Sequence, residues 1–312
     1  TVAVAKDGTP LHRAILWMDT RDAKYVPELV GGELRVQGYA AGKLARWISK
    51  TGGIPSLGGK EPVAHIHFLR HERPSVYQAA HMFLEPKDWL NARLCGRLCA
   101  TVDSIALHWV TDNRDIHRIA YDDRLLEMAG LERRRLPELV RATDAIGTLT
   151  ARAAGDLGLS IDVRVFGGTP DVHSAAIGSG AVRDWEPHLY IGTSSWLSCH
   201  VPFKKTDILR NVASLPSALP GRYFAANSQE TAGACVNWLR DAILWPRDVT
   251  DDREPPPDAL ARIDAAAASI APGADGVVFT PWLFGERRTI ADAMYARASR
   301  RACPRGLRQH VL

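Results

Sequence analysis

Asp171 stands at a point in the chain where a carboxylate could act as a base. A short apolar stretch, Val163–Phe166, comes first, then Gly167-Gly168-Thr169-Pro170, then Asp171 and a run of small residues. This pattern predicts a short buried strand, a tight loop and a helix, and α/β proteins place their chemistry at the carboxyl ends of strands. A carboxylate there could accept a proton from a hydroxyl nucleophile. Aspartate is also a favoured helix N-cap, and the local sequence leaves both interpretations open.

Gly192, Thr193 and Ser194 form a second candidate site. They make a turn of small residues between two stretches with strand-like alternation, 188–191 and 196–200. Such a turn offers backbone N–H groups and hydroxyls to a phosphate. The same residues also suit an ordinary hairpin, so both a phosphate loop and a plain turn are consistent with the local sequence.

Two groups of potential metal ligands do not match a metal site. His65, His67 and His71 occur in a helical stretch, but only the last two share a face of the helix. No carboxylate follows at a matching spacing, so we expect a solvated helix surface. Cys95 and Cys99 lack the second ligand pair of a zinc site. We therefore predict no metal-binding side chains.

Apolar periodicity predicts the elements that position these residues. A hairpin around Asp7-Gly8 is expected over residues 1–11, within strands that continue to Arg21. Further elements are predicted as helices over 42–50, 65–73, from 74 onward, 86–94, 121–130, 150–157, 174–178, 230–244 and 265–269, strands over 81–84, 163–166, 188–191 and 196–200, a turn over 136–139 and ordered alternation over 276–285. Strand–helix alternation through both halves indicates an α/β fold.

The composition is that of a globular chain. The 312 residues are 46% hydrophobic and 24% charged with a net charge of +4, which excludes a disordered protein. No apolar run approaches the ~20 residues that cross a bilayer, and no signal segment opens the chain. We expect a soluble cytoplasmic protein without a membrane partner. Five scattered cysteines exclude a disulfide scaffold.

The positive charge is concentrated at the C-terminal end. Residues 287–312 contain seven arginines and one acid, Asp292. A basic tail is one signature of nucleic-acid binding, but no binding motif accompanies it, and we expect no nucleic-acid partner. The Ala/Arg-rich composition differs abruptly from the preceding text, which indicates a tail of different origin, such as a shifted reading frame.

Seven short motifs occur in an order that resembles the FGGY family of carbohydrate kinases, in particular its xylulokinase branch. The motifs are Ile15–Arg21, Phe83–Gly96, Thr101–Ser104, Gly167–Asp171 with Gly178–Gly180, Ile191–Ser194, Glu230–Gly233 and Pro281–Arg287. The resemblance implies an actin/hexokinase-like fold, α/β, with two ribonuclease-H-like domains around an active-site cleft. It places an N-terminal domain over 1–182 and part of a C-terminal domain over 183–287, with the basic tail at 288–312.

The resemblance also implies an activity: ATP-dependent phosphorylation of a sugar hydroxyl with Mg²⁺, a ketopentose such as xylulose being the best match. Asp171 matches the family's catalytic base, which also contacts the sugar. Gly192, Thr193 and Ser194 match the loop that holds the ATP phosphates. A homodimer is the assembly that relatives suggest.

The sugar pocket of relatives is matched by the motif around Trp17. The resemblance implies that Trp17 lines the sugar pocket. It leaves open whether Asp19, which shares the motif with Arg21, binds sugar or forms a structural ion pair. The Lys87-Asp88 pair and Asp103 match positions that support the fold.

Several departures from the family pattern bear on activity. Thr169-Pro170 stands where relatives commonly have glycines, which makes the loop before Asp171 stiffer. The family's Asp-x-Gly-Thr phosphate loop and its Gly-rich adenosine segment are not found in these 312 residues. Phosphoryl transfer depends on such positioning groups. We therefore expect an incomplete fold and little or no kinase activity from this chain alone, and a non-catalytic remnant or sugar-binding module is the alternative.

Overall fold

The computed structural model describes most of the chain as two compact units. The described residues are 1–17, 19–36, 38–207, 212–229, 231–246, 254–281 and 283. Unit 1 comprises 1–188 and 198–226, and unit 2 comprises 189–197 and the described residues from 227 on. The predicted basic tail, Glu230 and residues 284–287 lie outside the described residues. The two units are defined by how compactly the residues pack, whereas the domain boundary expected after residue 182 follows from the family resemblance. That boundary stays a prediction.

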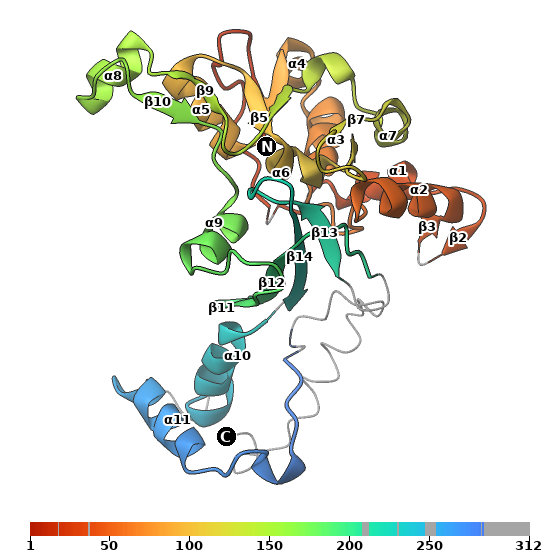
Figure 1. The fold of residues 1–312 in the computed structure, drawn as a ribbon. Helices are drawn as coiled ribbons and strands as arrows, with labels where there is room; N and C mark the ends of the chain where they lie inside the picture. The colour runs from red at the N-terminus through yellow and green to blue at the C-terminus, as the bar shows by residue number, and fades with distance from the viewer. Residues whose placement is uncertain are drawn as a thin grey trace. The chain divides into compact units, whose positions relative to one another are not determined.

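Unit 1 is a mixed α/β structure, as predicted (Figure 1). Its helices are α1 Val26–Val30, α2 Ala41–Thr51, α3 Pro62–Glu72, α4 Pro74–Ala79, α5 Pro86–Cys95, α6 Val102–Ile105, α7 Asp123–Ala129, α8 Ala151–Leu157 and α9 Asp171–Gly178. Its first strands are β1 Val2–Val4, β2 Arg35–Val36, β3 Tyr39–Ala40, β4 Met82–Leu84, β5 Cys99–Thr101, β6 Thr111–Asp112, β7 Ala120–Tyr121, β8 Glu138–Val140, β9 Ala145–Thr148 and β10 Arg164–Phe166. Single 3₁₀ turns occupy Ala23–Tyr25, Ala106–His108 and Arg133–Arg135.

Strands pair mostly in twos. β1 with β4, β2 with β3, β6 with β7 and β9 with β10 are antiparallel, whereas β5 and β8 are parallel. A four-stranded sheet has the order β11-β12-β14-β13, made of β11 His188–Ile191, β12 Ser195–Val201, β13 Ala213–Pro216 and β14 Tyr223–Gln229. β12 and β14 each run from one unit into the other.

The N-terminal hairpin is confirmed as a turn but not as two strands. Gly8 has φ +80°, a conformation that glycine adopts without strain. The returning segment forms a single bridge between Pro10 and Val4. Proline has no N–H to donate, so it does not extend a ladder. β1 pairs with β4 instead, and residues 15–21, predicted to continue as strand, contain none among the described positions.

Proline and glycine account for several helix ends. α3, α4 and α5 each begin with proline in the first turn, where its missing N–H costs nothing. α5, α7 and α8 end before Gly96, Gly130 and Gly158, all left-handed. The helices predicted over 42–50, 65–73, 86–94 and 150–157 are confirmed, and the one predicted over 121–130 is confirmed in part, because Tyr121 belongs to β7 and α7 begins at Asp123.

The main core of unit 1 gathers side chains from α1, α2, α3 and α7. Trp47 of α2 is fully buried, and its Nε1 donates to the carbonyl oxygen of Trp109 at 3.0 Å. Val63, Ile66 and Leu69 of α3 join the same cluster. Fully burying such side chains stabilises the fold by about 1.5–3 kcal/mol each.

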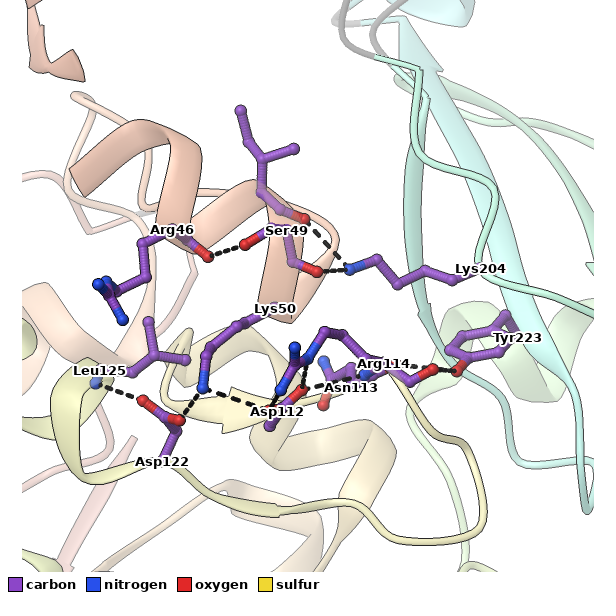
Figure 2. A network of polar contacts seen from close by, with 11 residues as sticks. Arg46, Ser49, Lys50, Asp112, Asn113, Arg114, Asp122, Leu125, Lys204 and Tyr223 are labelled. Atoms are coloured by element: carbon purple, nitrogen blue, oxygen red, sulfur yellow. Dashed lines mark hydrogen bonds and ion pairs between the residues drawn. The ribbon is translucent and has the colours of Figure 1, made fainter. Parts of the chain in front are cut away.

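A polar network connects α2 to later parts of unit 1 (Figure 2). Lys50 contacts the carboxylates of Asp112, at 3.3 Å, and Asp122. The Asp122 side chain also caps α7 by accepting from Leu125 N at 2.9 Å. The hydroxyl of Tyr223 in β14 donates a hydrogen bond to the carbonyl oxygen of Asn113 at 2.8 Å. This network ties β14 to segments more than 100 residues earlier in the sequence.

Unit 2 contains two α-helices and a 3₁₀ turn, Ala274–Gly276, among its described residues. α10 Gly233–Trp238 continues as a π-helical stretch over Leu239–Leu244, and α11 spans Ala259–Ala268. The predicted alternation over 276–285 is wrong for residues 277–281, which contain no strand; Val278 is 82% exposed. The predicted turn over 136–139 is also wrong in part, because β8 begins at Glu138 and pairs with β5.

Candidate active site

The loop before Asp171 requires both of its glycines. Gly167 is buried, and a Cβ there would lie 2.6 Å from the carbonyl oxygen of Arg141 and 2.7 Å from a methyl of Thr101. Gly168 has φ +68°, a region that side chains rarely adopt. The strand β10 before the loop is only partly buried, since Val165 is its one buried residue. The expectation of a buried strand is therefore wrong; among the described residues β10 pairs with one strand, β9.

Two polar side chains of α5 hold the start of the loop. Lys87 Nζ donates to the Gly167 carbonyl at 2.9 Å, and Asn91 Nδ2 donates to the same oxygen at 2.6 Å. Lys87 also contacts Asp88 Oδ1 at 2.5 Å and Thr101 Oγ1 at 3.1 Å. Burial raises the pKa of Asp88 to about 6, although the positive charge of Lys87 acts to lower it. A buried acid, a lysine and an amide thus anchor the loop.

Asp171 is the first residue of α9. Pro170 occupies the N-cap position, so the interpretation of Asp171 as an N-cap is wrong. The Asp171 side chain is exposed, and its Oδ1 accepts from Val172 N at 2.9 Å. Proline cannot donate from its backbone and fixes its own φ, here −57°. The result is an exposed carboxylate on a short, stiff backbone segment.

The motif around Trp17 has an exposed ring and an ion pair. Trp17 is 63% exposed, with Lys60 Nζ 5.9 Å from the centroid of its ring. Arg21 binds the Asp19 carboxylate through Nε, at 2.9 and 3.0 Å, and through its terminal nitrogen at 2.6 Å. These hydrogen bonds hold the pKa of Asp19 below its usual value. Of the two alternatives for Asp19, the structure contains the ion pair.

Gly192, Thr193 and Ser194 form a turn between β11 and β12, as predicted. Gly192 N donates to the carbonyl of Ser194 at 2.8 Å. The N–H groups of Thr193 and Ser194 have no acceptor among the residues that the structure describes, and Thr193 is exposed. Free N–H groups in a tight turn are what a phosphate loop needs.

The first turn of α10 supports this loop within unit 2. Gly233 N donates to the Gly192 carbonyl at 2.8 Å, and Ala232 N donates to that of Thr193 at 2.9 Å. A Cβ on Gly233 would lie 2.7 Å from the Gly192 carbonyl oxygen. The close approach of α10 to the loop therefore depends on a glycine at this position.

The predicted site residues belong to both units. Trp17, Asp19 and Asp171 are in unit 1, and Gly192–Ser194 are in unit 2. In the described part of the chain, no hydrogen bond, ion pair or ring contact joins Trp17 or Asp19 to Asp171.

The histidines of α3 correct one expectation. His65 is buried, His67 is half-buried and only His71 is exposed, so the helix is not a solvated surface. Apolar side chains of α3 face the core on more than one side, which places His65 inside. Burial lowers the pKa of His65 to about 3. Within the described residues, no cluster of three or more His, Cys, Asp or Glu could hold a metal.

Sequence reasoning missed a contact behind Asp171. Thr169 and His173, two residues to either side of Asp171, both contact the buried carboxylate of Asp103. The spacing of hydroxyl and imidazole around an aspartate was a visible signal. The Asp103 partner was not, because 66 residues separate it from Thr169.

The fold is that of the sugar kinases. A crystal structure of ligand-bound xylulose kinase from Lactobacillus acidophilus superimposes with a TM-score of 0.74 at 22% identity, over 94% of this chain and 54% of that one. The likeness supports the actin/hexokinase-like fold predicted from the sequence. In the described residues, no helix is both long and apolar enough to cross a membrane.

Sequence comparisons identify the family. The family model for the N-terminal domain of the FGGY carbohydrate kinases matches residues 1–178. A xylulose kinase of Lactococcus lactis is 26% identical over 94% of this chain and 53% of its own length. An L-fuculokinase of Escherichia coli K12 is 31% identical over 67% of this chain and 42% of its own length. This chain belongs to the FGGY family of carbohydrate kinases, and it spans about half the length of the xylulose kinases it matches.

Proposed function

We propose that the protein phosphorylates a sugar hydroxyl with ATP and Mg²⁺ in the cytoplasm, with a ketopentose such as xylulose as substrate. The observation that carries the proposal is the exposed carboxylate of Asp171 on the first turn of α9, after a loop anchored by Lys87 and Asn91. Membership of a carbohydrate kinase family makes a sugar the substrate class. The similarity to xylulose kinases favours a ketopentose.

In this proposal Asp171 is the general base. Its carboxylate accepts the proton of the sugar hydroxyl while the oxygen attacks the γ-phosphorus of ATP, and the bond from that phosphorus to the ADP oxygen breaks. Trp17 offers an apolar ring to the carbon chain of the sugar, and Asp19, held by Arg21, borders the same pocket. The domain boundary after residue 182 separates this sugar-binding part from the phosphate-binding part.

The residues of the second part fit a bound triphosphate. The unpaired N–H groups of Thr193 and Ser194 would hold the phosphate oxygens, and Gly192 closes the turn through its own N–H, which donates to the Ser194 carbonyl. Bound Mg²⁺ neutralises phosphate charge and is usually held by one or two carboxylates, waters and the phosphates themselves. An Mg²⁺ ion bound in this way does not require a cluster of three or more protein ligands.

The test is release of ADP over a panel of sugars. It uses the 312-residue chain and an extended chain. The extended chain joins the 312 residues to those segments of the Lactococcus lactis xylulose kinase that lie outside its match to them, so that it has the length of its relatives. We expect turnover of a ketopentose by the extended chain and little or none by the 312 residues alone. If the extended chain binds sugar but releases no ADP, the kinase assignment fails and the sugar-binding module is favoured. Sedimentation of the same samples tests the proposed homodimer.

A further inference from the structure

A hydroxyl, an imidazole and a carboxylate meet at the start of α9, and two of the three residues flank Asp171 in the sequence. Thr169 Oγ1 contacts Asp103 Oδ2 as a hydrogen-bond donor. His173 Nδ1 lies 3.1 Å from the Thr169 hydroxyl and 3.4 Å from the same carboxylate oxygen. A hydroxyl that donates to a carboxylate can only accept from the imidazole, so His173 Nδ1 carries the proton.

Two of the three groups are shielded from water. Asp103 and His173 are buried, and Thr169 is half-buried. Burial by itself would raise the pKa of Asp103, but the hydrogen bond and charge of His173, with hydrogen bonds from Thr101 and Thr169, bring it below its usual value. The second carboxylate oxygen, Oδ1, has no hydrogen-bond partner among the described residues. The charge of Asp103 is therefore compensated largely through Oδ2.

His173 is held from a second side. Its ring meets that of Phe224 in β14 edge to face, with centroids 4.2 Å apart and planes at 82°. Such aromatic pairs have a preferred geometry, which limits rotation of the imidazole. Because His173 is the third residue of α9, fixing its side chain fixes the turn that carries Asp171.

We propose that Thr169, His173 and Asp103 are positioning residues that hold the Asp171 carboxylate in one orientation. The inference rests on the proposed function of Asp171 as a base. Lys87 and Asn91 fix the loop at Gly167, and the three residues fix it on both sides of Asp171. Thr169 supplies the hydroxyl that joins the loop and the start of the helix to Asp103.

A pair of substitutions at Thr169 separates the hydroxyl from the shape of the side chain. Thr169→Val keeps the branched shape and removes the hydroxyl, whereas Thr169→Ser keeps the hydroxyl. Hydrogen–deuterium exchange of the 312-residue chain reports the amide of Ser174, which donates to the Pro170 carbonyl at 3.0 Å in the first turn of α9. We expect about tenfold faster exchange in Thr169→Val, the effect of losing about 1.4 kcal/mol of local stability. Thr169→Ser should exchange like the parent.

Two controls accompany the exchange experiment. Amides of α8, which makes none of these contacts, should exchange equally in all three proteins. Asp103→Asn removes the charge that both partners contact, and it should accelerate Ser174 exchange in the same direction. Unchanged Ser174 exchange in Thr169→Val overturns the proposal, whatever the activity.

Kinetics of the extended chain test positioning as opposed to mere stability. Thr169→Val should lower kcat about tenfold with the sugar KM within twofold, and Thr169→Ser should restore kcat. An equal kcat in all three proteins overturns the positioning role. If the parent extended chain itself shows no turnover, the proposed function fails, and the exchange rates alone decide whether the contacts to Asp103 hold the loop.

Discussion

Lys87 and Gly167 are 80 residues apart in the sequence, and the lysine Nζ donates to the glycine carbonyl at 2.9 Å. The same ammonium group contacts the buried carboxylate of Asp88 at 2.5 Å. One side chain therefore neutralises a buried acid and anchors the loop that leads to Asp171.

Replacing Lys87 with methionine should be strongly destabilising. The change leaves the Asp88 carboxylate buried without its cation, and breaking a buried pair typically costs about 3–5 kcal/mol. Because Lys87 is itself partly exposed, we expect a loss below that range, about 2–3 kcal/mol, in urea unfolding. The control is Lys24→Met, which removes an exposed pair with Glu72 and should cost much less, because water screens the two charges. Equal losses in the two variants would contradict the anchoring role.

The buried carboxylate of Asp22 should make the free energy of unfolding depend on pH. It is buried, neither carboxylate oxygen has a hydrogen-bond partner in the described part of the chain, and burial raises its pKa to about 6. The unfolded pKa is about 3.9. Between these values the folded state binds more protons, so the free energy of unfolding falls as the pH rises, by up to about 3 kcal/mol in total.

Asp22→Asn removes this titration. Relative to the parent, the variant should gain up to about 3 kcal/mol in unfolding free energy between pH 4 and pH 7. Asp112→Asn is the control of opposite sign, since hydrogen bonds from Arg114 lower the pKa of Asp112 to about 2. The stability contributed by Asp112 is present above pH 4 and is lost only as the pH falls toward 2. A constant difference between Asp22→Asn and parent over pH 4–7 would rule the assignment out.

Gly233→Ala tests the proposed phosphate loop in unit 2. The new Cβ would lie 2.7 Å from the Gly192 carbonyl oxygen, so α10 and the loop must separate. We expect ATP affinity to fall about tenfold or more, equivalent to about 1.4 kcal/mol, as measured by titration calorimetry on the extended chain. Gly178→Ala is the matched control, because its Cβ would meet nothing within 4 Å. Equal ATP affinities for both variants would mean that the loop does not bind phosphate.

Local rules predicted the helices and the turn of the second site well. Helices that begin at proline and end before a left-handed glycine, such as α5, carry their boundaries in the sequence. The pairing of β1 with β4 was not predictable, because the strands are about 80 residues apart and no local residue type specifies the partner. The burial of His65 was missed for a related reason: helical spacing identifies a face but not what packs against it.

In the candidate site, too, local features could be predicted from the sequence and long-range contacts could not. Asp171 and the Gly192 turn could be found from residue type and order, with the family resemblance supplying their roles. The ion pair of Asp19 with Arg21 is local, and it was one of two open alternatives. Asp103 could not be linked to Thr169 and His173 without the fold, since its contact depends on how α6 and α9 pack.

The most direct test of the kinase assignment is ADP release by the extended chain and its Asp171→Asn variant. Asparagine has nearly the same shape as aspartate but cannot accept the hydroxyl proton, and general base catalysis contributes about 10²–10⁴-fold. We predict that turnover of xylulose falls by about that factor while sugar affinity, measured by calorimetry, changes less than about threefold. Parental turnover in Asp171→Asn would contradict the assignment of Asp171 as the base.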